Sequence, residues 1–430
     1  MSTSSSSESE EEEEEEEDKA MMSRTTFSTT MRQSKSLSSI PKEVITRSEE
    51  TSIEENNTTS TTSTTIQSPS TKTKEGVLDH FNMYKPYKRK EQVYSKLDTK
   101  LPADCVEVGP RLRSGNVVLA SGTYLLDEST KVKSGHIGLY TVSVKSKSLV
   151  RLKTYGKSAI FNMRWCGNRL GAVTADSQFR LYRLREREKD EEPSLEHLGS
   201  ETSSKKSKQS GVHYTSLDWN PYEKQKVCVS HSNGNLSTWC TDRDEVKCVH
   251  EWRAHTYEGD TGAEVWSVSY YDSNVVLSGS DDMKLKTWDL RDRTVGLICK
   301  GHHEMGVTAI RTLKGAPNTI VTGSYDEMIR IFDIRSLRKG PVSSISCGGG
   351  VWQIRTAATQ NAVENRMIAA CMRGGVSVVS VSSDRGLVLE SSSPFDKELM
   401  YGVTCVNSTG DDSDLYASCS FYEHTLYLFS

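Results

Sequence analysis

One strand-turn-strand pattern occurs twice, 44 residues apart, and it is the strongest constraint on how this chain folds. The first copy is Val275-Val-Leu-Ser-Gly-Ser-Asp-Asp-Met-Lys-Leu-Lys-Thr-Trp-Asp289, and the second runs from Ile320 to Asp333. Each copy has an apolar strand, Gly-Ser-x-Asp, a turn, and a second strand that ends in an aromatic residue and Asp. A histidine precedes each copy, His255 and His302. A period in the range of about 20 to 50 residues indicates a repeat architecture, in which each unit buries its apolar face against the next.

These features resemble the WD repeat, whose units are four-stranded sheets arranged radially as propeller blades. Weaker copies surround the two clear ones and bring the count to seven; they span residues 104–143, 160–182, 213–239, 351–379 and 403–429. The sequence therefore predicts an all-β, seven-bladed WD-repeat propeller over residues 91–430. Since the last copy has only three strands, we expect Gln92–Leu97 to supply its outer strand. The charged stretch Arg183–Gln209 predicts an exposed loop between the second and third copies.

Residues 1–90 have a different composition from the propeller. Residues 1–73 carry 15 acidic and 7 basic side chains, whereas residues 74–430 carry 43 acidic and 47 basic ones. An acidic block from Glu10 to Asp18 is followed by Ser/Thr-rich stretches, and such a composition buries too little apolar surface to offset the entropy of ordering. We therefore expect a disordered acidic tail and linker over residues 1–90.

Several classes of protein are disfavoured by the same composition. No apolar run reaches the roughly 18 residues that a membrane helix needs, and the first residues lack the basic and apolar segments of a secretory signal. The ten cysteines include no CxxC pair, so they are expected to be buried thiols and not zinc ligands. The slightly basic propeller shows no dense basic stripe for nucleic acid. We expect a cytoplasmic monomer without a cofactor or bound metal, and without direct membrane or nucleic-acid contact.

The histidine, turn aspartate and aromatic residue of each clear copy are expected to form a structural hydrogen-bonded network. The resemblance to WD repeats assigns Asp282 to His255 and Trp288 in this role. It assigns Asp326 to His302 and Phe332 in the next copy. A buried carboxylate needs polar partners, and the repeat supplies them, so these pairs are not predicted to be catalytic.

Residues that the repeat does not require are the candidates for function. Trp266 and Trp352 occupy the same repeat position, one residue after the first valine of the inner strand. Because side chains alternate along a strand, this position faces away from the core between blades and toward the mouth of the central channel. Two tryptophans there suggest either a binding platform or a plug that closes the channel.

A narrower resemblance comes from short loops in the last four copies. They are Gly-Ser-Tyr-Asp-Glu at 323–327, Gly-Gly-Val-Trp at 349–352, Ala-Ala-Cys-Met at 369–372, Tyr-Gly at 401–402 and Ser-Cys-Ser-Phe-Tyr-Glu-His at 418–424. Together they resemble the WD-repeat family of diphthamide biosynthesis. The resemblance implies a methylesterase that acts on methylated diphthine of elongation factor 2, a substrate with a trimethylammonium group.

Ester hydrolysis needs an activated water or nucleophile and donors for the oxyanion. No Gly-x-Ser-x-Gly elbow is present. We expect His424 to act as general base, since the ordinary pKa of a histidine suits proton transfer near neutrality. The other predicted site residues are Glu327, Glu423 and Cys419 as partner or nucleophile, the amides of Gly348, Gly349 and Gly350 as oxyanion donors, and the rings of Trp266, Trp352, Tyr325 and Tyr422 around the ammonium group.

A non-catalytic adaptor is the alternative, because propellers commonly offer their loop faces to protein partners. Trp288-Asp-Leu-Arg291 and Phe332-Asp-Ile-Arg335 resemble the WD-x-R motif of substrate receptors for cullin-type ubiquitin ligases. The motif is short and arises readily within ordinary WD repeats, so the esterase remains the preferred hypothesis.

Overall fold

The computed structural model describes residues 92–186, 192–203, 211–313, 316–356, 365–382, 384–393, 395–407 and 414–430. The predicted disordered tail over residues 1–90 lies outside the described residues. Within them, no helix is long and apolar enough to cross a membrane.

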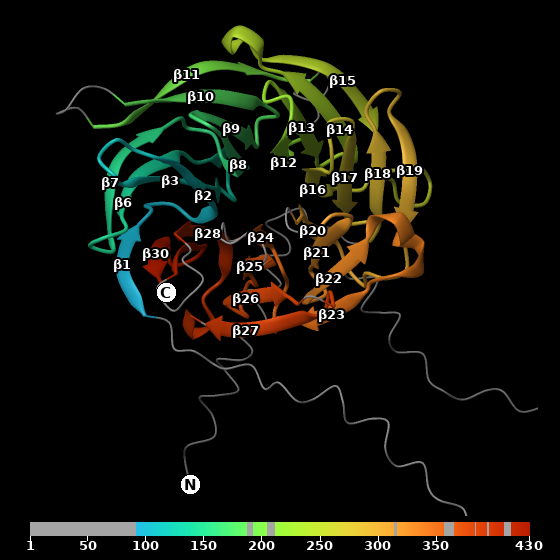
Figure 1. The fold of residues 1–430 in the computed structure, drawn as a ribbon. Helices are drawn as coiled ribbons and strands as arrows, with labels where there is room; N and C mark the ends of the chain where they lie inside the picture. The colour runs from blue at the N-terminus through green and yellow to red at the C-terminus, as the bar shows by residue number, and fades with distance from the viewer. Residues whose placement is uncertain are drawn as a thin grey trace, which may run out of the picture. The chain divides into compact units, whose positions relative to one another are not determined.

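The described residues form seven four-stranded antiparallel sheets, and the inner strands of successive sheets contact one another around a ring (Figure 1). From the inner to the outer strand, the first four sheets are β2 (Ala103–Arg111), β3 (Val117–Thr123), β6 (Ile137–Ser143), β7 (Ser148–Tyr155); β8 (Ile160–Cys166), β9 (Arg169–Thr174), β10 (Phe179–Arg185), β11 (Ser194–Glu201); β12 (Tyr214–Trp219), β13 (Lys226–His231), β14 (Asn235–Cys240), β15 (Lys247–Arg253); and β16 (Val265–Tyr270), β17 (Val275–Ser280), β18 (Leu285–Asp289), β19 (Thr294–Cys299). The last three are β20 (Val307–Thr312), β21 (Thr319–Ser324), β22 (Met328–Asp333), β23 (Ser343–Ser346); β24 (Gln353–Thr356), β25 (Asn365–Ala370), β26 (Val376–Val381), β27 (Leu387–Ser393); and β28 (Met400–Asn407), β29 (Leu415–Ser420), β30 (Thr425–Phe429), β1 (Val93–Asp98).

A small hairpin of β4 (Leu125–Leu126) and β5 (Lys133–Ser134) extends the first sheet's loop. Three short 3-10 turns complete the described elements, η1 (Asp242–Asp244), η2 (Ile334–Lys339) and η3 (Phe395–Lys397). The seven-bladed, all-β prediction is confirmed.

The first strand of the propeller closes the ring. β1 pairs antiparallel with β30, from Val93 opposite Phe429 to Asp98 opposite Thr425. In Figure 1 the blue β1 lies beside the red β30. Leu97 packs on the apolar cluster between the first and last blades. The prediction that residues 92–97 supply the missing outer strand is confirmed, and closure removes the unpaired edge that an open sheet would expose.

Apolar side chains that alternate along each strand fill the spaces between neighbouring blades. Between the first and last blades, Val106, Leu119 and Tyr140 pack with Leu426 and Leu428, and each is fully buried. Burial of a side chain of this size stabilises the fold by about 1.5–3 kcal/mol. The cysteines follow the same pattern, since six of the ten are buried and all ten are free thiols.

The prediction of an exposed loop over Arg183–Gln209 is wrong for its central part. Residues Ser194–Glu201 form β11, the outer strand of the second blade, which pairs with β10. Leu195 is 6% exposed and packs on the blade's core, so the stretch carries a strand pattern despite its many charges. Residues 187–191 and 204–210 lie outside the described residues.

The structural network of the fourth blade is confirmed. His255 Nδ1 lies 2.9 Å from both carboxylate oxygens of Asp282, and its Nε2 lies 2.7 Å from Ser278 Oγ. The indole of Trp288 donates to the same Ser278 hydroxyl at 2.9 Å. All of these groups are at most 7% exposed. The Asp282 carboxylate therefore has a structural role, because its hydrogen bonds hold two strands together.

In the fifth blade the predicted histidine is off by one residue. His303, and not His302, is the buried ring, and its Nε2 lies 2.9 Å from Thr322 Oγ1. Asp326 instead accepts from the Glu304 N–H and pairs with Arg330 at 2.8 Å. The sequence His302-His303 offers both rings, and only the strand register decides which one enters the core.

Ring closure predicts a measurable difference between two shortened chains. A chain that begins at Gln92 keeps β1, whereas one that begins at Thr99 leaves β30 with an open edge and uncovers part of the core. We expect the second chain to melt at a temperature lower by at least about 5 °C, because several kcal/mol of pairing and burial are lost. Differential scanning calorimetry checks this, and equal melting temperatures would contradict closure by β1.

A candidate site at the mouth of the channel

Each inner strand begins at the same end of the channel. Most inner strands have a β-bulge there, with one residue more than the neighbouring strand that pairs with them. Within the described ranges, six inner strands have a shift of register at their second residue, opposite the end of the neighbouring strand. In the sixth blade the equivalent residue, Trp352, directly precedes β24 and donates its N–H to the Ala370 carbonyl at 2.9 Å. We call these seven residues the mouth ring: Asp104, Phe161, Thr215, Trp266, Thr308, Trp352 and Tyr401.

The bulge explains why these side chains are available. A β-bulge places two residues opposite one, bends the strand and turns a side chain out of the regular alternation. The residue before each bulge, such as Ala103, Ile160 or Val265, is at most 1% exposed in the core between blades. The bulged residue that follows is turned toward the channel.

A small cavity of about 30 Å³ lies at this mouth. Its lining combines six members of the mouth ring with two amide side chains: Asp104, Phe161, Thr215, Trp266, Thr308, Trp352, Asn162 and Gln353. This volume is far below the roughly 300–1,000 Å³ that is common for small-ligand pockets, and it is enough for about one water molecule. A side chain of a substrate therefore enters this pocket only if the rings around it move apart.

An arc of aromatic rings surrounds the pocket. Neighbouring ring centroids lie 4.7 to 6.4 Å apart, within the range of favourable aromatic contacts. In order along the arc, the rings are Trp266, Trp352, Tyr401, Phe421, Tyr124, Phe161 and His213. Six of the seven blades contribute to it.

Trp266 is held in place by the half-buried carboxylate of Asp281. Its indole Nε1 donates to Asp281 Oδ1 at 2.6 Å, and Tyr257 donates to the other carboxylate oxygen at 3.4 Å. Burial raises the pKa of Asp281 to about 6, although both hydrogen bonds oppose the shift. Asp281 and Asp282 are adjacent in sequence, yet Asp281 positions a pocket wall and Asp282 holds the blade.

Asp104 is the unusual group of the pocket. It is 6% exposed, and among the described residues its carboxyl group has no hydrogen-bond or ion-pair partner. Burial raises its pKa to about 8. A buried acid without partners is costly to keep in a fold, and groups with strongly shifted pKa values concentrate at functional sites. Asp104 is therefore the strongest candidate for chemistry at this mouth.

The polar groups beside Asp104 are partly fixed. The Val403 N–H donates to Oε1 of Gln353 at 2.7 Å, which leaves the NH₂ end of that amide for other contacts. The hydroxyls of Thr215 and Thr308 donate to the carbonyls of Val265 and Val351, so they tie neighbouring blades together. Among the described lining residues, the amide NH₂ groups of Gln353 and Asn162 thus have hydrogen-bonding capacity to spare.

The four predicted catalytic residues are not brought together. Among the described residues, none of His424, Glu327, Glu423 and Cys419 lines the pocket, and no hydrogen bond joins any two of them. Glu423 accepts from the Ser420 hydroxyl within its own turn. Cys419 is fully buried, its Sγ lies 3.5 Å from the Ala103 carbonyl, and burial raises its pKa. Its thiol stays protonated, so the geometry does not favour it as a nucleophile.

The predicted binding residues divide into two groups. Trp266 and Trp352 line the pocket, whereas Tyr325 and Tyr422 lie outside its lining. Gly349 and Gly350 are explained by close packing: a Cβ on Gly349 would lie 2.2 Å from the Cys371 carbonyl oxygen, and one on Gly350 would lie 2.8 Å from a methionine sulfur. Their role in the structure is the close approach of two loops.

The described residues hold no group of three or more His, Cys, Asp or Glu side chains placed to bind a metal ion. The sequence analysis missed Asp104, Phe161, Asn162 and Gln353. A signal for two of them was present, because Asp104 and Phe161 follow Ala103 and Ile160 as Trp266 follows Val265. Extending that one repeat position to every blade identifies the whole mouth ring.

Comparisons with known proteins agree with this fold. Residues 246–289 and 294–333 match the family described as "WD domain, G-beta repeat". A solved structure, "Crystal Structure of Mitotic Checkpoint Complex", superposes with a TM-score of 0.56 at 14% identity, over 84% of this chain and 98% of that one. At that identity the similarity shows the propeller fold alone.

The similarity to curated proteins indicates a family as well as a fold. "Diphthine methyltransferase homolog" of Dictyostelium discoideum is 32% identical over 291 residues, 63% of this chain and 75% of the relative. "Diphthine methyltransferase" of Homo sapiens is 29% identical over 66% of this chain and 67% of its own length. "E3 ubiquitin-protein ligase COP1" of Arabidopsis thaliana is 26% identical over only 28% of this chain and 17% of its own length.

The unpaired carboxyl group of Asp104 predicts a gain of stability on its removal. Since its pKa is about 8 when folded and about 3.9 when unfolded, the folded state binds more protons between these values, and stability falls as the pH rises through them. We expect Asp104→Asn to be more stable than the wild type by at least about 1 kcal/mol at pH 8, and by less at pH 5. Urea unfolding at both pH values measures this.

The exposed Asp242 supplies the matched control, since Asp242→Asn makes the same chemical change outside the pocket. It is expected to leave the free energy of unfolding unchanged at both pH values. A loss of stability in Asp104→Asn at pH 8 would mean that the carboxylate has a stabilising partner, and would contradict its assignment as an unpaired acid.

Proposed function

This chain belongs to the WD-repeat family of diphthamide biosynthesis, and on that premise we propose that it is a carboxylic ester hydrolase. The proposed substrate is the methyl ester of methylated diphthine on elongation factor 2. The product is diphthine, formed before the final amidation. The observation that carries the proposal is an aromatic pocket at the channel mouth with one buried, unpaired carboxyl group.

The pocket walls suit the trimethylammonium group of this substrate. Quaternary ammonium ions bind over aromatic faces within about 6 Å of the ring centroid. Trp266 and Trp352 lie side by side with centroids 5.5 Å apart, and Phe161 lies across the mouth ring. A cation held among these rings also favours the ionised form of the nearby Asp104, since an opposite charge lowers the pKa of an acid.

Asp104 is assigned as the general base of the hydrolysis. Its carboxylate accepts a proton from a water molecule as the water oxygen attacks the ester carbonyl carbon. The tetrahedral intermediate then collapses, the bond from the carbonyl carbon to the methoxy oxygen breaks, and the proton passes to the leaving methoxide to give methanol. A base with a pKa near the working pH is effective in both transfers. The amide NH₂ of Gln353 is the candidate donor to the developing oxyanion.

Hydrolysis fits the pocket better than methyl transfer does. Transfer of a methyl group requires a donor molecule beside the acceptor, whereas hydrolysis requires only water. The cavity of about 30 Å³ has room for a water molecule but none for a nucleoside-sized donor. The curated relatives are named diphthine methyltransferase, which supports a role in diphthamide biosynthesis.

Methanol release from methylated elongation factor 2 tests the proposal. We expect the purified chain to release methanol, Asp104→Asn to lower kcat by about 100-fold or more, and Trp352→Leu to raise KM more than it lowers kcat. The wild-type kcat/KM is expected to rise with pH toward the Asp104 pKa of about 8. No methanol release from correctly modified factor would refute the esterase.

His424→Ala is the informative comparison, because His424 is the base expected from the sequence. Its turn lies outside the pocket lining, and Asp104 as base predicts a change of less than about threefold. If His424→Ala lowers kcat as much as Asp104→Asn does, His424 and not Asp104 would be assigned as the base.

An adaptor function is the second candidate, and one observation favours it. The Arg291 side chain is 73% exposed at the end of its WD-x-R motif, where it is held by Asp289. Arg335 is held by Asp333 in the same way, with a Nη2 to Oδ2 distance of 2.6 Å. Both arginines therefore present an exposed basic group, held by an aspartate, just after the third strand of their blades.

Capture by the adaptor subunit of a cullin-type ligase tests this second candidate. If the motif is functional, wild-type chain is captured in a pull-down and the Arg291→Ala, Arg335→Ala double variant is not, while methanol release is the same for both. Absence of capture, or capture that the double variant retains, excludes the motif as a ligase contact.

A further inference from the structure

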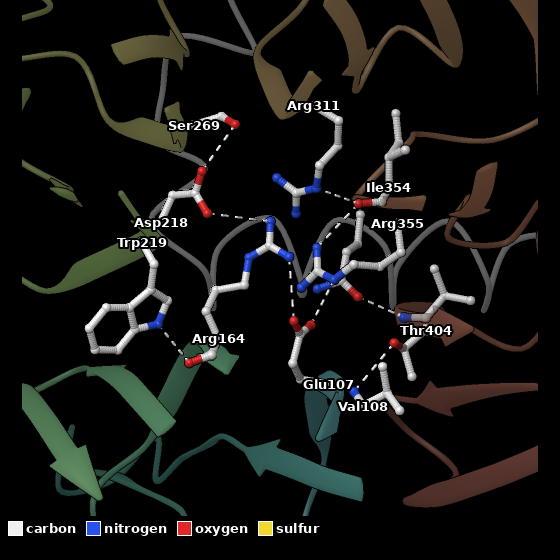
Figure 2. A network of polar contacts seen from close by, with 12 residues as sticks. Glu107, Val108, Arg164, Asp218, Trp219, Ser269, Arg311, Ile354, Arg355 and Thr404 are labelled. Carbon is white, nitrogen blue, oxygen red and sulfur yellow. Dashed lines mark hydrogen bonds and ion pairs between the residues drawn. The ribbon is translucent and has the colours of Figure 1, made fainter. Parts of the chain in front are cut away.

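A second ring of side chains lies three residues further along each inner strand. Figure 2 shows it from close by, with side chains from all seven inner strands converging on the channel. We call these residues the charged ring: Glu107, Arg164, Asp218, Ser269, Arg311, Arg355 and Thr404. They line a cavity of about 290 Å³ at the far end of the channel, together with Val108, Thr312, Thr356 and Cys405.

Two of the three arginines are paired with carboxylates. Arg355 Nε donates to Glu107 Oε2 at 2.7 Å, and Arg164 lies 3.4 Å from the other oxygen of Glu107. Arg164 also lies 3.9 Å from Asp218, which accepts from the Ser269 hydroxyl at 3.2 Å. The acids of this ring are therefore all on the side of Arg164 and Arg355.

Arg311 has no carboxylate within ion-pair distance among the described residues. Its Nε donates to the Ile354 carbonyl at 2.8 Å and its Nη1 to the Ile310 carbonyl at 2.6 Å. Arg355 donates to the same Ile354 carbonyl at 3.2 Å, which brings two guanidinium groups together (Figure 2). Burial, Arg164 and Arg355 together lower the pKa of Arg311.

One arginine of the charged ring also has a hydrogen-bond donor that is not used. Arg355 is 5% exposed, and its buried Nη2 has no hydrogen-bond partner. Three arginines face two carboxylates, so the ring carries one positive charge in excess. A buried charge needs a partner, and guanidinium forks match the paired oxygens of phosphate and carboxylate groups.

We propose that the charged ring binds a phosphate group, held between the guanidinium groups of Arg311 and Arg355. The ligand's oxygens accept from the free Nη2 groups, and its negative charge offsets the excess charge of the ring. The source is either free inorganic phosphate or the phosphate monoester of a larger molecule. This proposal is independent of the proposed esterase, which uses the mouth ring at the opposite end of the inner strands.

Calorimetric titration of the full chain with inorganic phosphate, and separately with phosphoserine, tests the site at constant ionic strength set with chloride. We expect wild type to bind at least one of the two, and Arg311→Met to bind at least about tenfold more weakly. Tighter binding of phosphoserine indicates a monoester as the source, and tighter binding of phosphate indicates the free ion. No binding of either by the wild type overturns the proposal.

Two further variants separate a binding site from a purely structural cluster. Arg338→Met removes one exposed arginine elsewhere, and it is expected to bind phosphate as the wild type does. Without phosphate, Arg311→Met is expected to melt no lower than wild type, because a repulsion between arginines is relieved; with phosphate, only the wild type is stabilised. If Arg311→Met fails to fold, Arg311→Lys keeps the charge without the fork and is expected to weaken binding. Equal phosphate affinity in wild type and Arg311 variants overturns the proposal.

Discussion

One extra residue near the start of six of the seven inner strands organises the mouth of the channel in this propeller. The residue before the bulge fills the core between blades, and the bulged residue is turned to the channel mouth. Because the ring repeats this geometry, Asp104, Phe161 and Trp352 meet at one pocket although they are far apart in the sequence. Closure of the ring by β1 then fixes how far apart the blades hold them.

The same strands place two unlike sites at the two ends of one channel. The mouth has aromatic walls and a single buried acid, whereas the far end has arginines in excess over carboxylates. At each end, a charged or ionisable group lacks an ionic partner among the described residues: the carboxyl of Asp104, which is 6% exposed, and the guanidinium of Arg311, which is partly buried. Local rules of stability that a fold breaks in this way commonly coincide with its function.

The architecture could be predicted from the sequence because each clear repeat contains its strands, its turn and its hydrogen-bonded network within about 44 residues. The closing strand followed from the same count. The catalytic candidates were harder, since His424 and Glu327 are conspicuous in turns, while Asp104 looks ordinary at the start of an apolar strand. Its raised pKa arises from the surrounding structure, which removes water and supplies no partner among the described residues. Likewise, the choice of His303 over His302 depends on strand register, which the two adjacent histidines do not reveal.

The central claim is that the modified side chain of the substrate enters the mouth ring beside Asp104. The most direct measurement is a structure of the Asp104→Asn variant trapped with methylated elongation factor 2. The predicted result is a trimethylammonium group within about 6 Å of the Trp266 and Trp352 ring centroids, with the ester carbonyl next to residue 104. A substrate bound at the outer loops or at the far end of the channel, with the mouth pocket empty, would contradict the claim.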